Sequence, residues 1–211
     1  MVRVAVDAMG GDNAPGEIVK GCLEALRKSP EVKILLCGKP EVLEQALAGQ
    51  SYPAERLETV PASEVIETGD SPVISVRKKK EASLVVGMKL IREERADAFV
   101  SAGNSGAILV GGQVLVGRLP GVERAPFAPL LPTEDGGATL LLDSGANVDA
   151  KAAHLVQFAQ MGSLYMERAL GISRPRVAIL NVGLEEEKGN ALVKETYPLL
   201  KATPGLNFIG S

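Results

Sequence analysis

Hydrophobic residues follow two alternating patterns along the chain. Short apolar and β-branched runs, typical of strands, alternate with longer segments whose apolar positions recur at helical spacing. The strand patterns are residues 3–7, 33–37, 98–101, 139–143 and 177–181, with a weaker one at 57–60 and a last one at 206–209. Several of these runs are apolar at nearly every position, which is typical of parallel strands buried on both faces.

Helices are predicted between most of these strands. The first begins after Asn13, with Pro15 in its first turn, and ends near Pro30; the others span residues 41–48, 82–95, 105–116, 152–170 and 191–200. This alternation predicts an α/β fold, a doubly wound, mostly parallel sheet with helices on both faces, in a single domain over residues 1–211. Residues 117–137, rich in Gly and Pro, form a long connection that we expect to be a flap or an interface arm.

The two ends of the chain and its cysteines lead to further expectations. A βα series is not expected to stop at Gly210-Ser211 directly after a strand, so we expect the chain to be cut short at its carboxyl end. The amino end enters a strand without a signal-peptide pattern, and the apolar stretch 107–117 is too short to span a bilayer. Cys22 and Cys37 have no metal-like spacing and are expected to be buried, reduced thiols. These features indicate a reducing, cytoplasmic compartment.

Composition excludes several classes of function. A net charge of -3, 3% aromatic residues and no Trp argue against binding nucleic acid. The single histidine, His154, leaves no set of residues for a Cys/His metal cluster, so we expect neither a metal nor another cofactor.

Candidate chemistry gathers where four predicted strands end. In open parallel sheets, ligands bind beyond the carboxyl ends of the strands. Each of the four turns here combines Gly with Asn, Asp or Ser, which is either ordinary turn chemistry or, because four turns share one edge, a functional edge. The candidate residues are Asp7, Gly10, Gly11, Asp12 and Asn13; Ser101, Gly103, Asn104, Ser105 and Gly106; Asp143, Asn147 and Asp149; and Asn181, Gly183, Glu186, Lys188, Gly189 and Asn190.

The turn after residues 98–101 has the clearest physical logic. Gly103 and Gly106 permit a sharp turn, the predicted helix presents unpaired N–H groups at Ser105, and Asn104 adds a side-chain donor, an arrangement that suits a phosphate or an oxyanion. No Walker or GxGxxG motif is present, and residues 103–107 miss the GxSxG pattern by the last glycine. A Ser-His-Asp triad would have to use His154, which reads as a surface or core-edge residue, so a covalent serine mechanism is not expected.

Charged residues outside these turns are further candidates for binding. The run Arg77, Lys78, Lys79 and Lys80 is either a solvated helix face or a site that docks an acidic partner or steers an anionic substrate. Arg124, in the Gly- and Pro-rich connection, is a candidate anion clamp.

The run from Val6 to Pro15, Val-Asp-Ala-Met-Gly-Gly-Asp-Asn-Ala-Pro, resembles the opening signature of the bacterial phosphate acyltransferases. The likeness continues through residues 101–106, 121–124, 142–149 and 180–190. Departures are small: Ser105 stands where Thr is usual, Ser144 where Val is usual, and Ala125 separates Arg124 from Pro126. The family continues well beyond Gly210, with segments implied to serve at the membrane and in the dimer.

The resemblance implies transfer of a fatty acyl group from acyl carrier protein to inorganic phosphate, giving acyl phosphate for glycerophospholipid synthesis. It also implies a homodimer, coupling to a membrane glycerol-3-phosphate acyltransferase, contact with the inner face of the membrane through the absent part, and a fold similar to isocitrate and isopropylmalate dehydrogenases and to phosphotransacetylase. On this interpretation Asp7, Asn104, Asn147 and Lys188 are candidate catalytic residues. The other turn residues and Arg124 bind substrate, and the run from Arg77 to Lys80 docks the carrier.

This chemistry agrees with the residues, because phosphate is itself the nucleophile and the protein needs only to position two substrates and stabilise an oxyanion. Three alternatives stay open. They are a phosphotransacetylase-like enzyme that uses acyl-coenzyme A, a dehydrogenase of the related fold that needs a metal and a nicotinamide, and a non-catalytic scaffold of lipid synthesis.

Overall fold

A computed structural model describes residues 1–185 and 188–211. Contacts within the chain divide it into two compact units, Met1–Arg118 and Leu119–Ser211, where the sequence pattern predicts one domain. In the described part of the chain, no helix is both long and apolar enough to cross a membrane.

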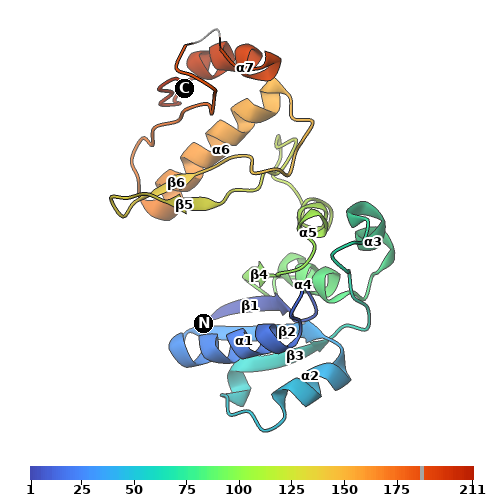
Figure 1. Ribbon diagram of the computed structural model, residues 1–211. Helices are drawn as coiled ribbons and strands as arrows, with labels where there is room; N and C mark the ends of the chain where they lie inside the picture. Colours follow the sequence, from blue (N-terminus) through green and yellow to red (C-terminus); the bar gives the residue numbers. More distant parts are fainter. Residues whose placement is uncertain (186–187) are drawn as a thin grey trace. The chain divides into compact units, whose positions relative to one another are not determined.

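A parallel sheet forms the centre of the first unit (Figure 1). Its strands are β1 (Val2–Asp7), β2 (Val32–Gly38), β3 (Leu57–Pro61) and β4 (Ala98–Val100), in the order β3-β2-β1-β4. Val4 of β1 pairs with Ile34 on one side and with Ala98 on the other. The predicted strands 3–7, 33–37, 57–60 and 98–101 are therefore confirmed, and so is the parallel α/β class.

Helices connect the strands of this unit and cover both faces of the sheet. They are α1 (Gly16–Lys28), α2 (Pro40–Leu47), α3 (Pro72–Lys78), α4 (Ser83–Arg92) and α5 (Ser105–Gly111), with a 3-10 turn η1 (Ala54–Arg56) and a π-helical turn η2 (Gly112–Val116). The predicted helix 105–116 thus divides into α5 and η2, and α3 was not predicted.

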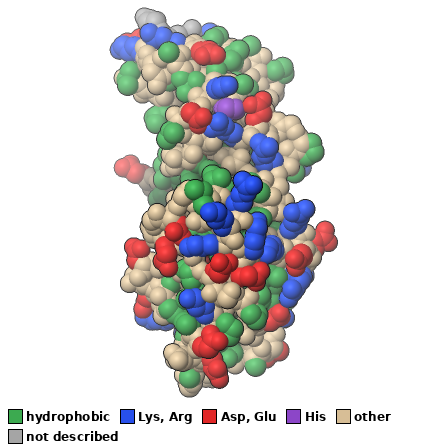
Figure 2. Space-filling view, turned by 90° about the vertical axis from the view of Figure 1, so that its right-hand side faces the viewer, with side chains coloured by type: hydrophobic (Ala, Val, Ile, Leu, Met, Phe, Trp, Pro, Cys, Tyr) green, Lys and Arg blue, Asp and Glu red, His purple; other side chains and the backbone are tan. Residues whose placement is uncertain are grey.

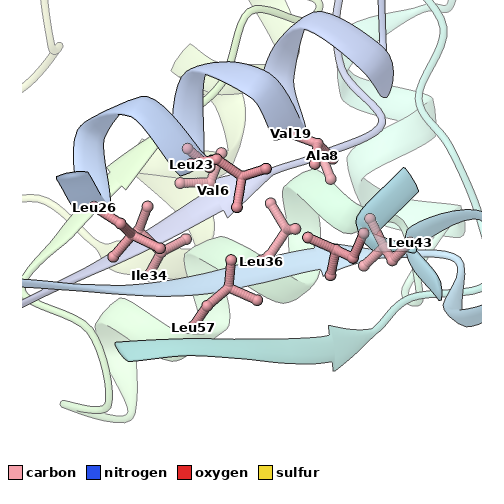
Figure 3. Packing of buried hydrophobic residues seen from close by; sticks show 11 residues of the cluster. Val6, Ala8, Val19, Leu23, Leu26, Ile34, Leu36, Leu43 and Leu57 are labelled. Atoms are coloured by element: carbon pink, nitrogen blue, oxygen red, sulfur yellow. The ribbon is translucent and has the colours of Figure 1, made fainter. Parts of the chain in front are cut away.

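Strand periodicity decides which side chains meet which helices. Neighbouring residues of a strand point to opposite faces. Val6 and Leu36 pack with Leu23 of α1 and Leu43 of α2 (Figure 3), whereas Ala5, Leu35 and Cys37 pack with Leu90 of α4. The sheet is therefore buried on both faces, and its carboxyl edge carries the turns that follow β1 and β4.

In its described residues, 119–185 and 188–211, the second unit contains a small hairpin and two helices. The hairpin pairs β5 (Leu130–Pro132) with β6 (Ala138–Leu140) in antiparallel fashion, and α6 (Ala152–Leu170) and α7 (Ala191–Ala202) contact each other. The predicted helices 152–170 and 191–200 are confirmed, the second of them two residues longer.

Three predicted strands of this unit differ from the structure. Residues 139–143 do not add a parallel strand but contribute to the hairpin, because Gly136, at φ +81°, and the Asp135 carboxylate, which accepts from Gly137 N, close a turn that reverses the chain. Residues 177–181 and 206–209 join no sheet; they run in parallel with one bridge, Val177 with Phe208, and a hydrogen bond from Ile179 N to Gly210 O. Their apolar pattern was read correctly as extended chain, but a strand also needs a long pairing partner, which periodicity does not reveal.

Candidate active site

The Asp7 carboxylate joins three elements at the carboxyl edge of the sheet. Asp7 ends β1 and is 2% exposed. Its Oδ1 accepts a hydrogen bond from Ser83 Oγ at 2.5 Å, and its Oδ2 accepts one from Ser101 Oγ at 2.7 Å. Ser83 begins α4 and Ser101 follows β4, so one buried side chain fixes the starts of two connections relative to β1.

The turns after β1 and β4 pack backbone against backbone beside Asp7. A Cβ on Gly10 would overlap the Asp7 carboxylate, and a Cβ on Gly103 would lie 3.2 Å from the Gly10 Cα. Gly11 has φ +105°, and a Cβ there would lie 3.0 Å from Ala102 O. Only glycine fits such a close approach. We call residues 8–13 and 101–106 together the glycine-lined junction; Asp12 and Asn13 are exposed at the far end of its first turn.

Asn104 is buried and its amide holds neighbouring backbone. Its Oδ1 accepts from Ala107 N at 2.9 Å and so caps α5. Its Nδ2 lies 3.0 Å from both Thr68 O and Asp70 O, and thereby holds the loop 67–70 against the start of α5. The amide is therefore engaged in structure, while the catalytic role expected from the sequence stays a prediction.

The start of α5 shows what the junction offers an anion. Ser105 and Gly106 occupy the first two helical positions, where backbone N–H groups have no intrahelical acceptor. The Ser105 side chain is exposed, and Gly106 has no side chain because a Cβ there would lie 2.6 Å from Pro72 Cγ. Backbone donors and small side chains of this kind suit a compact oxyanion such as phosphate.

The two thiols are poor nucleophiles. Cys22 and Cys37 are free and buried, as the sequence predicts. Burial raises the pKa of Cys22 to about 11, and burial together with the nearby Asp7 charge raises the pKa of Cys37 to about 12. Because the thiolate is the reactive form, neither residue suits covalent catalysis near neutral pH. Among the described residues, no group of three or more His, Cys, Asp or Glu side chains could hold a metal ion.

In the second unit, the predicted residues form two connected pairs: Asp143 with Asn147, and Arg124 with Asp149. Asp143 accepts from Phe127 N and Asn147 N, each at 2.7 Å. Arg124 forms a bidentate ion pair with Asp149, with Nη1 2.5 Å from Oδ1 and Nη2 3.0 Å from Oδ2. The hydrogen bonds from Arg124 hold the pKa of Asp149 below its ordinary value. Arg124 therefore has a carboxylate partner in this structure.

His154 lies in the first turn of α6 and is 5% exposed, deeper than its sequence context indicated. Its Nδ1 accepts from Lys151 N at 3.1 Å, and its Nε2 lies 3.0 Å from Glu123 Oε2. Both ring nitrogens are used, so His154 anchors the chain before Arg124 to α6. Sequence reasoning missed Glu123 as its partner, since nothing in the local pattern pairs residues so far apart.

The turn before α7 brings together the last group of predicted residues. Asn181 Nδ2 donates to Lys188 O at 3.3 Å, and Gly189 lies so close to Asn181 that a Cβ would overlap its Oδ1. Lys188 pairs with Glu185 at 2.8 Å, which lowers the pKa of that carboxyl, and Asn190 caps α7. Gly183 lies within the same turn, and Ser211 Oγ donates to its carbonyl. Glu186 falls outside the described residues.

The basic run does not form one solvated face. Lys79 turns inward, where its Nζ lies 2.6 Å from Asp70 Oδ2 and 2.7 Å from Val65 O. Arg77 and Lys78, in the last turn of α3, and Lys80 after it are exposed. Ser83 and Asp70 were missed by sequence reasoning. Their only local signals are a helix start at Ser83 and a turn-forming Gly69-Asp70-Ser71-Pro72.

The sequence profile described as "Fatty acid synthesis protein" matches residues 2–211. The chain belongs to this family. Relatives called "Phosphate acyltransferase" are 50% identical over 210 residues in Thermoanaerobacter pseudethanolicus, 47% over 210 in Alkaliphilus oremlandii and 49% over 211 in Desulfitobacterium hafniense. All three alignments cover 100% of this chain but only 61%, 62% and 62% of the relatives. This member of the family thus spans about three fifths of their length, and the predicted resemblance is confirmed.

Solved structures with the same fold support the predicted architecture. A phosphotransacetylase from Streptococcus pyogenes aligns with a TM-score of 0.70 and 14% identity over 100% of this chain and 68% of that one. A 4-hydroxythreonine-4-phosphate dehydrogenase from Burkholderia phymatum aligns with a TM-score of 0.53 and 16% identity over 100% and 73%. At such identities the likeness concerns the fold alone, and it confirms the expected similarity of fold to phosphotransacetylases and to a dehydrogenase-like protein.

Proposed function

We propose that the complete protein transfers a fatty acyl group from acyl carrier protein to inorganic phosphate, and that the acyl phosphate serves glycerophospholipid synthesis. The glycine-lined junction carries this proposal. It presents backbone at the carboxyl edge of a parallel sheet, in a family whose members are named phosphate acyltransferases.

The proposed reaction needs no nucleophile from the protein. A phosphate oxygen attacks the thioester carbonyl carbon, the new C–O bond replaces the C–S bond, and the carrier thiolate leaves and takes up a proton from solvent. The two buried thiols, with their raised pKa values, agree with such a direct transfer. The protein then has to hold the two substrates in line and stabilise the oxyanion of the tetrahedral intermediate.

Phosphate is proposed to bind at the glycine-lined junction. Ser105 and Gly106 supply N–H groups at the start of α5. Gly10 and Gly103 let the two turns pack backbone against backbone behind that start, which holds it in place. In this proposal Asp7 is a positioning residue rather than a ligand, because its oxygens already accept from Ser83 and Ser101, and a second anion next to it would be repelled.

Residues of the second unit have proposed roles as well. Arg124 and Lys188 are cations held by the carboxylates of Asp149 and Glu185, and an anionic substrate that competes for them would gain a charge-assisted donor. Asp143, Asn147, Asn181 and Asn190 are proposed to shape the turns that carry these cations.

We also propose a cytoplasmic homodimer that supplies acyl phosphate to a membrane glycerol-3-phosphate acyltransferase. Two apolar side chains of η2, Val114 and Val116, are 65% and 42% exposed, and a second copy that covers them would remove apolar surface from water. We propose that any contact with the membrane is made by the part of the complete protein that corresponds to the region of the relatives that this chain does not cover.

Purified complete protein tests the reaction directly. Acyl-carrier protein and phosphate are mixed with the enzyme, and acyl phosphate is trapped with hydroxylamine; a parallel reaction contains acyl-coenzyme A. Product from the carrier thioester supports the proposal. Product from acyl-coenzyme A alone would support the phosphotransacetylase-like alternative. Carrier binding without product from either donor would support the non-catalytic scaffold.

A pair of glycine variants tests the location of the phosphate site. Gly103→Ala pushes a methyl group toward Gly10, and a displacement of this kind should raise the phosphate concentration needed for half-maximal rate by about tenfold or more. Gly21→Ala, on α1 with open space around it, is the control and should leave the phosphate dependence unchanged. If the two folded variants need the same phosphate concentration for half-maximal rate, phosphate does not bind at the junction.

A further inference from the structure

The outer surface of α3 carries a small mixed face. Val73 and Ile74 are 63% and 53% exposed, and Arg77 and Lys78 follow them four residues later on the same helix. Residues at i and i+4 are neighbours on a helix, so each apolar side chain stands beside one cation. The four side chains line a shallow hollow of about 350 Å³. We call this set the α3 face.

The fold does not need these apolar side chains. The buried positions of α3 are Ser75 and Val76, and Val76 alone of its residues joins the core that contains Leu84 and Met88. Single exposed apolar residues are common, but two adjacent β-branched ones beside two cations resemble the centre and rim of a binding surface. Figure 2 views the side on which α3 lies in Figure 1 and shows Lys and Arg side chains gathered there, with hydrophobic and acidic side chains beside them.

The positive charge of the face is not neutralised nearby. Asp70 is occupied by Lys79, and Glu81 lies 3.9 Å from Lys89. Within the residues that the structure describes, Arg77 and Lys78 take part in no ion pair. The face is therefore a local positive site on a chain whose net charge is -3.

Helix α3 and the loop before it contact the glycine-lined junction. Asn104 holds the carbonyls of Thr68 and Asp70 just before α3, and Lys79 just after it returns to Asp70. Pro72, the first residue of α3, lies against Gly106, where a Cβ would come within 2.6 Å. A partner bound to α3 is thus held at a fixed place relative to the turn that begins α5.

We propose that the α3 face docks an acidic protein helix whose carboxylates surround an exposed apolar side chain, and that this partner is the acyl carrier of the proposed reaction. The inference rests on the proposed function for the identity of the partner. Complementary charge favours it, since an acidic partner would be repelled by the chain as a whole and needs a local positive site for capture. Two adjacent cations are fewer than the four to eight that basic membrane-binding clusters contain, which favours a protein over an anionic bilayer.

The docking residues differ from the basic run as read from the sequence. Lys79 is excluded, because it is bonded internally, and Lys80 is left out, because it follows the helix and does not line the hollow. Val73 and Ile74 are added. Replacing Lys79 would loosen the loop 67–70 and confuse docking with local unfolding, so it has no place in the test.

Binding is measured with complete protein and fluorescently labelled acyl carrier protein, by anisotropy, at low and high salt. Arg77→Gln with Lys78→Gln should raise Kd by about three- to tenfold at low salt and by less at high salt, because exposed charges act at long range and are screened. The control is Arg27→Gln with Lys28→Gln, the same residue types in the last turn of α1, where Lys28 is paired with Glu24; this variant should bind like the parent.

The apolar half of the face has its own pair of variants. Ile74→Ala should raise Kd by about two- to fivefold at both salt concentrations, since loss of apolar contact is not screened. Leu164→Ala, on α6 with an exposure of 54% against 53% for Ile74, is the control and should have no effect.

Parent-like binding by the Arg77/Lys78 variant at low salt would overturn the inference. It would also fall if the same variant lost binding to anionic phospholipid vesicles while carrier binding stayed intact, or if it changed the dimer fraction in sedimentation and nothing else. Because anisotropy needs no turnover, a parent that binds carrier through α3 but makes no acyl phosphate would refute the proposed function and leave the docking surface standing.

Discussion

Replacing Asn104 tests how the glycine-lined junction is held together. Asn104→Ala removes the cap on Ala107 N and both amide hydrogens that lie near Thr68 O and Asp70 O. Loss of an Asn cap costs about 1 kcal/mol, and each lost hydrogen bond to a carbonyl costs about 0.5–1.5 kcal/mol. The local free energy of unfolding of residues 65–79 should therefore fall by about 2–4 kcal/mol.

Two further variants divide this effect into its parts. Asn104→Asp keeps a side chain that caps helices as well as Asn does, but it removes the two amide donors, so most of the loss should remain. Asn190→Ala is the matched control, because Asn190 caps α7 through the same contact, to Val193 N at 2.9 Å, and its side chain is exposed. It should cost about 1 kcal/mol, confined to the start of α7.

Amide hydrogen exchange followed by mass spectrometry reads these local stabilities peptide by peptide. For Asn104→Ala, protection of residues 65–79 should fall by about thirty- to seven-hundredfold, since every 1.4 kcal/mol is a factor of about ten. The phosphate requirement should rise as well, because the turn at Ser105 loses its support. Equal protection of residues 65–79 in Asn104→Ala and Asn190→Ala would show that the amide does not hold the loop.

Two other predictions follow from ionisable groups. The pKa of Asp70 is lowered from 3.8, chiefly by the hydrogen bond from Lys79 and also by that from Glu67 N. The unfolded chain therefore binds more protons than the folded one in this range, and the stability that Asp70 contributes is complete above 3.8 and is lost as pH falls through the folded value. Acid titration of exchange in residues 65–79 should show this loss in the parent, whereas Asp70→Asn should start lower and stay flat; a parallel decline in both proteins would contradict it. For the thiols, Cys22 and Cys37 should resist iodoacetamide in the native protein at mildly alkaline pH and react once it is denatured, because burial raises both pKa values. Mass analysis before and after denaturation checks this, and rapid native labelling of either residue would refute it.

Much of the first unit followed from local pattern alone. Ala5 and Val6, or Leu35 and Leu36, alternate between the two faces of the sheet, and a run that is apolar at both positions predicts a strand covered by helices on both sides. Asp7, Gly10, Ser101 and Gly103 could be placed together because the carboxyl ends of parallel strands share one edge.

Partners far apart in sequence were decided by the tertiary structure. Ser83 meets Asp7 across 76 residues. Lys79 turns inward to Asp70 and Val65 O, which neither interpretation of the basic run, a solvated face or a docking site, had indicated. Residues 177–181 are apolar and extended, yet they join no sheet and pair with residues 207–210 through one bridge and a few backbone hydrogen bonds. Periodicity reports which side of an element is apolar, because burial acts on each residue separately. It does not report which carboxylate a serine reaches or which strand an extended segment joins, because those hydrogen bonds depend on where distant segments of the chain come to lie.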